Sequence, residues 1–133
     1  MDNCVFCKII NKQIPSKIVY EDDIVIAFMD INPICDGHTL IVPKKHIENI
    51  FTVDDNTFLY MYKIAKELTP ILEKATNESS MSYDINYGDA QAIKHIHLHL
   101  LPNVRQRPHR KVEDVYNRII GVINEKKAIE KES

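Results

Sequence analysis

Three histidines recur at every second position of the segment 95–101, HIHLHLL. Side chains two residues apart share one face of a β-strand, so His95, His97 and His99 are expected on one face and the apolar residues between them on the other. Neighbouring positions on such a face lie about 6.6 Å apart, which lets two imidazoles bracket one phosphorus or one metal ion. All three reach a single atom less easily. The spacing therefore predicts a division of labour, in which one pair acts on a substrate and the end histidine does something else.

Three kinds of chemistry fit this row of histidines. Two of them and a third ligand could hold a catalytic zinc ion that activates water. Alternatively, a neutral imidazole could attack phosphorus directly while its neighbour donates a hydrogen bond to the phosphate oxygens. In the third interpretation the histidines are only the polar face of a strand. The residues of this segment leave the alternatives open.

The amino-terminal segment Cys4-Val-Phe-Cys7 is a second motif that could bind metal. By itself a CxxC pair is half a zinc site, a redox pair or neither, and the βαβ pattern of a thioredoxin-like pair is not seen around it. A structural zinc ion takes four Cys or His ligands, and His46 and His95 are the spare histidines that could complete the set. The six histidines of the chain leave other combinations open.

Hydrophobic periodicity predicts the elements that position these residues. Apolar runs predict five strands, of which the first two form a hairpin through Glu21–Asp23. Helical spacing predicts one central helix from about Asp55, with a capping box from Thr52, that kinks or ends near Pro70. A second amphipathic stripe predicts a C-terminal helix over about 111–126. The expected fold is therefore α+β, a mainly antiparallel sheet with these two helices. The expected strands are 18–20, 24–29, 38–42, 82–86 and 93–101.

The composition suits one cytoplasmic domain spanning residues 1–133. A net charge of −2 gives no argument for binding nucleic acid or an acidic membrane surface. No apolar stretch approaches the roughly 18 residues of a membrane span, and the start MDNCVFCKII lacks the pattern of a signal peptide. The odd number of cysteines, three, fits a reducing compartment. None of the three glycines belongs to a glycine-rich phosphate loop, so side chains and scattered amides must hold any phosphate.

The motif HIHLHLL resembles the signature of the histidine triad (HIT) family. The segments CVFCKIINKQIPSKIVYEDDIVIAFMDINP and GHTLIVPKKHI resemble the amino-terminal half of that family in order and spacing, and NYGDAQ resembles its phosphate loop. The resemblance covers about residues 4–102 and is strongest to the phosphoramidase-like branch. It implies a HIT-like α+β fold, a homodimer, and hydrolysis of nucleoside phosphoramidates or related nucleotides.

The resemblance also implies a role for each matching residue. His97 corresponds to the nucleophile that attacks the α-phosphorus and forms a covalent nucleotidyl-histidine intermediate, which water then hydrolyses. His99 corresponds to a residue that contacts the phosphate, and Asp30 to the acceptor of the ribose hydroxyls. Zinc-bearing relatives use a set that falls on Cys4, Cys7, His46 and His95, which implies a structural zinc site. Six residues match the walls around a purine base, although each of them also fits a position in the hydrophobic core: Val5, Phe6, Ile9, Ile18, Phe28 and Ile31. Asn86 and Gln91 match the loop near the phosphate and the leaving group.

Two positions depart from the family pattern. Ala92 stands where the family usually has Ser or Thr, whose hydroxyl assists the leaving group, so turnover could be slower or the leaving group different. Lys94 replaces a common aromatic or apolar residue and is expected opposite the histidines. Ala92 motivates an alternative function, a zinc-stabilised nucleotide-binding module with little turnover. A zinc-dependent hydrolase is a third alternative, and His38 is expected to be structural.

Overall fold

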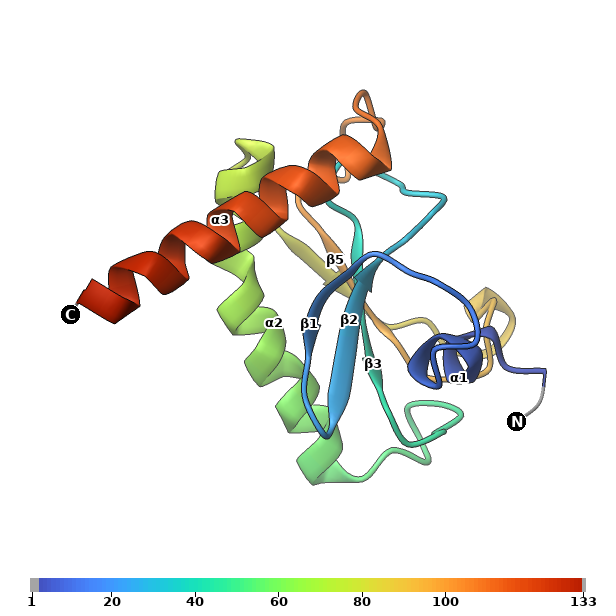
Figure 1. The fold of residues 1–133 in the computed structure, drawn as a ribbon. Coiled ribbons are helices and arrows are strands. Elements are labelled where there is room, and N and C mark those ends of the chain that lie inside the picture. Colours follow the sequence, from blue (N-terminus) through green and yellow to red (C-terminus); the bar gives the residue numbers. More distant parts are fainter. Residues whose placement is uncertain (1–2, 133) are drawn as a thin grey trace.

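Five short strands form one antiparallel sheet in the computed structural model, which describes residues 3–132 (Figure 1). Their order across the sheet is β1-β2-β3-β5-β4. The predicted hairpin of β1 and β2 is present, and β5 lies between β3 and β4, inside the sheet. The predicted α+β class is confirmed. The strands are β1 (Ile18–Glu21), β2 (Val25–Met29), β3 (Thr39–Pro43), β4 (Ser82–Asp84) and β5 (Leu98–Leu101).

Helices cover both faces of the sheet (Figure 1). The long helices α2 (Asp55–Thr76) and α3 (Val112–Glu132) pack on one face, where Ile41 and Leu98 point, and α1 (Val5–Ile10) packs on the other. Every residue of β2 and β3 is consequently buried. Strands covered on both faces carry continuous apolar runs instead of alternating ones, which is what VIAFM and TLIVP show.

The helix α1 is not predicted by the sequence pattern, because six residues are too few to show a helical period. Its N-cap is Cys4, whose Sγ accepts a hydrogen bond from the backbone N–H of Cys7 at 3.4 Å. Phe6 and Ile9 are its buried residues and pack on the sheet. The CxxC motif therefore opens a helix that lies on the face of the sheet carrying His99.

The central helix does not end at Pro70, contrary to one expectation, but continues to Thr76. Pro70 is on the exposed side of the helix. Because proline has no N–H, the backbone carbonyl one turn earlier receives no hydrogen bond from it, and water can donate to that carbonyl instead. Asp54 is the N-cap of the helix, and its carboxylate accepts from Thr57 N–H at 3.1 Å, so the capping box expected from Thr52 is wrong. Its C-cap is Asn77, which adopts a left-handed conformation with φ 59°.

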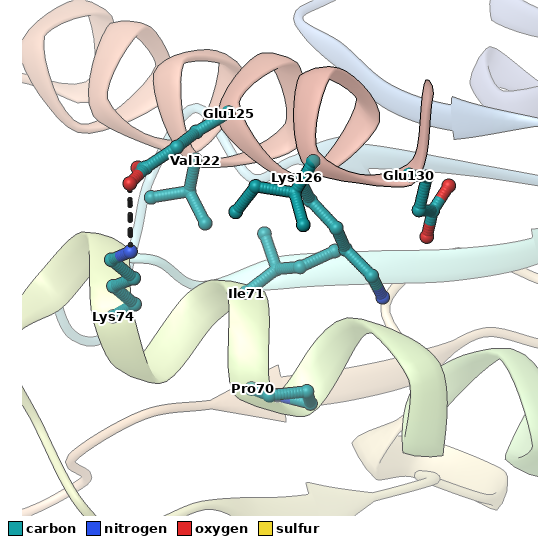
Figure 2. A pocket seen from close by; sticks show the side chains of 8 residues that line it. Pro70, Ile71, Lys74, Val122, Glu125, Lys126 and Glu130 are labelled. Carbon is teal, nitrogen blue, oxygen red and sulfur yellow. Dashed lines mark hydrogen bonds and ion pairs between the residues drawn. The ribbon is translucent and has the colours of Figure 1, made fainter. Parts of the chain in front are cut away.

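The C-terminal helix is longer than the expected 111–126 and runs to Glu132. Val115 and Ile119 bury its first turns in the core, and Arg118 Nε donates to the carbonyl of Ala75 at 2.7 Å. Farther along, α3 crosses α2 above an apolar groove, with the Lys74–Glu125 ion pair (3.3 Å) at its edge (Figure 2). Among residues 3–132, no helix combines the length and apolarity that crossing a membrane requires.

The histidine strand is shorter than predicted, since β5 begins at Leu98 and leaves His95 and His97 before it. The cause is a change of partner: Ile96 N–H donates to the carbonyl of Ile47 at 2.8 Å, outside the sheet. The segment is also buried on both sides, so the simple alternation of polar and apolar faces fails from 95 to 98. His99 keeps the predicted strand geometry and pairs with Leu40 of β3 and Asp84 of β4.

We expect Asp22 in the hairpin turn to make folding stability depend on acid pH. Burial opposes its ionisation, but hydrogen bonds from Tyr60, from the backbone and from Tyr20 outweigh burial and lower the carboxyl pKa from 3.8 to about 2. A lowered pKa stabilises the fold fully above pH 3.8, and that stabilisation is lost as the pH falls toward 2. Urea unfolding should show Asp22→Asn to be less stable than wild type at pH 7 by on the order of 2 kcal/mol, with the difference shrinking below pH 3.8. The neighbouring exposed Asp23→Asn is the control, and an equal pH dependence in both variants would contradict the assignment.

Candidate active site and thiol–imidazole cluster

A cavity of about 410 Å³ opens between α1, the loop after β2 and the segment before β5. Its lining combines apolar side chains with the polar groups of Asp30, Asn86, His97 and His99. The groove between α2 and α3 is similar in size, about 380 Å³, but its lining contains no histidine or cysteine (Figure 2). The cavity beside α1 is therefore the candidate active site, because it combines apolar walls with convergent polar groups that can do chemistry.

Most of the residues singled out from the sequence come together in this cavity. Those that line it are Val5, Phe6, Ile9, Phe28, Asp30, Ile31, Asn86, Ala92, His97 and His99. Two do not line it. Ile18 packs beneath the wall, beside Phe6 and Phe28. Gln91 is buried and its amide donates to the carbonyl of Glu48 at 2.5 Å, so it ties the loop 86–92 to the loop after β3.

His97 is oriented by its own backbone neighbourhood. Its Nδ1 lies 2.8 Å from the carbonyl of His95, and since a carbonyl only accepts, Nδ1 carries the proton. The unprotonated Nε2 then belongs to an imidazole that lines the cavity while being only 6% exposed. Burial lowers the pKa of His97, which keeps the ring neutral. A neutral imidazole with a free ring nitrogen facing a cavity is a competent nucleophile.

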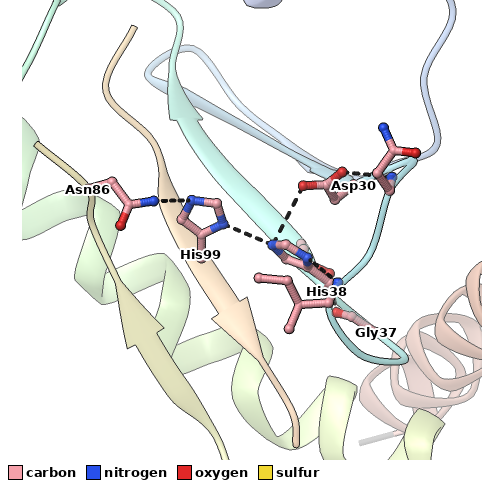
Figure 3. Close-up of polar contacts among 8 residues, drawn as sticks. Asp30, Gly37, His38, Asn86 and His99 are labelled. Carbon is pink, nitrogen blue, oxygen red and sulfur yellow. Dashed lines mark hydrogen bonds and ion pairs between the residues drawn. The ribbon is translucent and has the colours of Figure 1, made fainter. Parts of the chain in front are cut away.

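A chain of hydrogen bonds fixes the opposite tautomer on His99 (Figure 3). The backbone N–H of Ile34 donates to His38 Nδ1 at 3.1 Å, so the proton of neutral His38 is on Nε2. That Nε2–H donates to His99 Nδ1 at 2.9 Å and also faces Asp30 Oδ2 at 3.6 Å. His99 Nδ1 is thus an acceptor, and the ring presents Nε2–H as a donor. We expected His38 to be structural. Its contact with His99, 61 positions away in the chain, was not predicted from the sequence.

Two hydrogen-bond donors, one from His99 and one from Asn86, lie side by side in the cavity. His99 Nε2 lies 3.4 Å from the side-chain nitrogen of Asn86 (Figure 3). Burial, followed by the neighbouring His97 and His38, lowers the pKa of His99 to about 4, so the ring is neutral at pH 7 and donates only through Nε2. Neither nitrogen can accept from the other, so His99 Nε2–H can donate either to the Asn86 amide oxygen, if that amide turns over, or to an oxygen of a bound anion. The imidazole ring centroids of His97 and His99 are 4.8 Å apart, which places these donors beside the His97 ring.

The thiol–imidazole cluster consists of Cys4, Cys7, His46 and His95, whose four ligand atoms all lie within 4.8 Å of one another. Cys4 Sγ is 3.3 Å and Cys7 Sγ 3.6 Å from His95 Nδ1, and Cys7 Sγ is 3.2 Å from His46 Nδ1. Ligands around a tetrahedral zinc ion with ordinary Zn–S and Zn–N bonds are separated by roughly 3.5 Å. Burial and the adjacent Cys4 raise the pKa of Cys7 to about 11.

The hydrogen bond of His95 Nε2 leaves the other ring nitrogen, Nδ1, free to bind a metal ion. Its Nε2 lies 2.8 Å from the carbonyl of Pro43, so Nε2 carries the proton and Nδ1 offers its lone pair to the cluster. A ligating histidine typically donates its other N–H to such a group, which fixes the tautomer. The residues present therefore fit a zinc ion in both geometry and donor chemistry. The end histidine of the row faces the cluster, whereas His97 and His99 face the cavity.

Comparison with known proteins places this chain among HIT proteins. The HIT domain family matches residues 11–106. An uncharacterized HIT-like protein of Borreliella burgdorferi is 41% identical over 111 residues, which cover 79% of this chain and 78% of that protein. Adenosine 5'-monophosphoramidase HNT1 of Candida albicans is 32% identical over 106 residues, covering 75% and 70% of the two chains. The crystal structure of a zinc-bound histidine triad family protein from Mycobacterium smegmatis superposes with a TM-score of 0.81 at 25% identity, covering 96% and 98%.

Proposed function

The chain belongs to the histidine triad (HIT) family, and we propose that it is a nucleotide hydrolase or transferase acting at the α-phosphorus of nucleoside phosphoramidates or related nucleotides. The observation that carries the proposal is the pairing of tautomers in the cavity. His97 offers an unprotonated Nε2, and His99 beside it offers Nε2–H. One group suits attack on phosphorus and the other suits stabilisation of the phosphate oxygens. We extend this assignment to the whole chain as one HIT-like domain in the cytoplasm.

The reaction would proceed in two displacements. His97 Nε2 forms a bond to the α-phosphorus as the bond from phosphorus to the leaving group breaks, and the leaving group departs with a proton supplied by the substrate or by water. Water then attacks the phosphorus of the nucleotidyl-histidine and gives up one proton to the solvent. The bond from phosphorus to Nε2 breaks, which releases the nucleoside monophosphate and restores the neutral imidazole. In both steps His99 Nε2–H and the Asn86 amide would donate to the phosphate oxygens, where negative charge builds up.

The nucleoside would occupy the rest of the cavity. The apolar walls contributed by Phe6, Ile9 and Phe28 suit the flat face of a purine base. Asp30 also lines the cavity, and its carboxylate accepts a hydrogen bond from the backbone N–H of Asn32 at 2.8 Å. A carboxylate so fixed would accept hydrogen bonds from the ribose hydroxyls.

A metal-activated mechanism fits the cavity less well. Asp30, His38 and His99 present three ligand atoms within 4.8 Å of one another. Binding a metal through His38 Nε2, however, would require the proton to move to Nδ1, where the N–H of Ile34 already donates. The geometry of this group therefore favours an orienting role for His38 over metal ligation.

We also propose that the thiol–imidazole cluster holds a structural zinc ion, supported by its geometry and by the zinc-bound relative. Such an ion would tie α1 to the loop after β3 and to the segment before β5, without taking part in phosphoryl transfer. The alternative function, a zinc-stabilised nucleotide-binding module with little turnover, remains motivated by Ala92, which is exposed and lines the cavity.

A substrate screen with a trapping step tests the proposed function. The purified protein would be assayed against nucleoside phosphoramidates, adenosine 5'-phosphosulfate and dinucleoside polyphosphates. Rapid alkaline quenching with a substrate labelled at its α-phosphate should leave the label on the protein as an acid-labile adduct. Binding of nucleoside monophosphate without turnover of any of these substrates would favour the binding module instead.

Replacing Ala92 with serine tests what the missing hydroxyl does. If a hydroxyl here helps the leaving group depart, Ala92→Ser should raise kcat for substrates with poor leaving groups, such as alkylamines, by about 10-fold. Substrates with good leaving groups should change little, because they need no such help. Equal effects across a leaving-group series would mean that the proton comes from the substrate or from water. Ala90→Ser, in the same loop and also lining the cavity, is the matched control.

We propose that the protein is a homodimer joined through α2 and β4, as the family resemblance implies. β4 is the edge strand of the sheet, and Leu59, Tyr62 and Tyr83 are exposed on this side. Thr69 and Tyr83 are hydrogen-bonded at 2.7 Å, so helix and strand present one continuous surface. Sedimentation at micromolar concentration should give twice the chain mass, and Tyr62→Glu should give monomers. A wild-type monomer would remove this proposal.

A further inference from the structure

The short helix α1 contacts both the thiol–imidazole cluster and the nucleotide cavity. Cys4 caps the helix and Cys7 lies one turn later, and both belong to the cluster. Phe6, between them, lines the cavity. Its ring meets the imidazole of His97 edge to face, with centroids 5.0 Å apart and planes at 81°, and meets the ring of His95 at 6.0 Å.

Two restraints that start from the cluster act on the imidazole of His97, whose other ring contact is with His99, with centroids 4.8 Å apart. The hydrogen bond from Nδ1 to the carbonyl of His95 holds one edge of the ring. A single hydrogen bond still permits rotation about the side-chain torsions, and such rotation would swing Nε2 away from a bound phosphorus. The Phe6 ring closes that space, since aromatic contacts of this geometry have a defined orientation. Each restraint starts from the cluster, because His95 is a member and Phe6 is flanked by two others.

We infer that Phe6 is a positioning residue: it holds the His97 imidazole in the orientation for attack and couples that orientation to the geometry of the Cys4/Cys7/His46/His95 cluster. The inference rests on the proposed function, which makes His97 the nucleophile. A residue that only formed the wall around the base would contribute to binding, so its loss would raise KM and leave kcat unchanged. A positioning residue must also affect kcat, because a displacement of about 1 Å can cost 10²-fold in rate.

Phe6→Leu and Phe28→Leu form a matched pair for the test. Both phenylalanines are buried and line the same cavity, but Phe28 makes its ring contact with Phe6, at 5.5 Å, and not with His97. With zinc content and circular dichroism checked, both variants should raise KM by a similar factor. Only Phe6→Leu should lower kcat, by about 10- to 100-fold. Similar kcat values in the two variants would overturn the positioning role.

A double-mutant comparison tests the link to the cluster. Cys7→Ser should lower kcat clearly in the wild-type background and by a factor at least about 3-fold smaller in the Phe6→Leu background, because the contact that transmits the change is already gone. Equal factors in both backgrounds would show that Phe6 does not couple the cluster to His97.

A measurement without turnover separates this inference from the proposed function. In ¹⁵N spectra of the histidine rings, wild-type His97 should show a single Nδ1–H tautomer. Phe6→Leu should broaden or split that signal, whereas Phe28→Leu should leave it unchanged. An unchanged His97 signal in Phe6→Leu would overturn the inference even if no substrate were found. Absence of turnover in wild type, with the expected spectra, would contradict only the proposed function.

Discussion

Replacing His97 with asparagine should reduce turnover of a nucleoside phosphoramidate by at least about 10⁴-fold, because the covalent route through the imidazole is then lost. Asparagine keeps a side-chain N–H that can donate to the carbonyl of His95, so the local hydrogen bond can persist. Steady-state kcat and the yield of labelled adduct measure the effect, and both should fall together. Because the side chain is buried between Phe6 and His99, the melting temperature is measured in parallel.

The other two histidines of the row serve as internal controls. His99→Ala removes one donor to the phosphate oxygens and should cost about 10²–10³-fold in rate while the adduct still forms. His95→Ala should chiefly weaken metal binding and lower stability, since its ring faces the cluster. A His97 variant with near-normal turnover would eliminate nucleophilic catalysis at this position and bring the zinc-hydrolase alternative forward.

Protein purified without chelator should contain about one zinc ion per chain, and the double variant Cys4→Ser, Cys7→Ser should contain none. The cluster joins three segments that are far apart in the chain, so losing the metal removes a tie between them. We expect the melting temperature to fall by at least about 10 °C, which corresponds to a loss of only a few kcal/mol in a domain of this size. Metal analysis and thermal unfolding by circular dichroism provide the measurements.

Cys35→Ser is the matched control for the cysteine variant. Cys35 is a free thiol that is 1% exposed and lies outside the cluster. The variant should keep its zinc, even if the buried hydroxyl lowers the stability of the fold. If the double variant retained its zinc, the assignment of the metal to this cluster would be wrong.

The long elements follow from local sequence because their causes are local. Continuous apolar runs in β2 and β3, the hairpin turn and the helical stripe of α2 all appear with the expected type, and their ends differ by a few residues. Helix α1 escapes prediction because it is shorter than two turns. The passage of α2 through Pro70 depends on which side of the helix faces solvent, which only packing decides.

In the candidate site, too, some features could be predicted from the sequence and others could not. The spacing of the three histidines by itself predicted a division of roles, because three residues along a strand reach a single atom less easily than two. The assignment of His95 to the cluster and of His97 and His99 to the cavity came from the family resemblance, and the structure places the rings on those two sides. Their proton positions could not be predicted, since each depends on a backbone partner that only the folded chain supplies.

Tertiary structure alone decided the contact of His38 with His99 and the closure of the thiol–imidazole cluster. The first arises because β5 pairs with β3, which sets Leu40 beside His99 and brings the start of β3 to the histidine row. The second joins positions 91 and 39 residues apart. The sequence determined which side chains were available for chemistry, because residue type and spacing are local properties. The fold decided which nitrogen of each histidine carries a proton, because that depends on long-range hydrogen bonds.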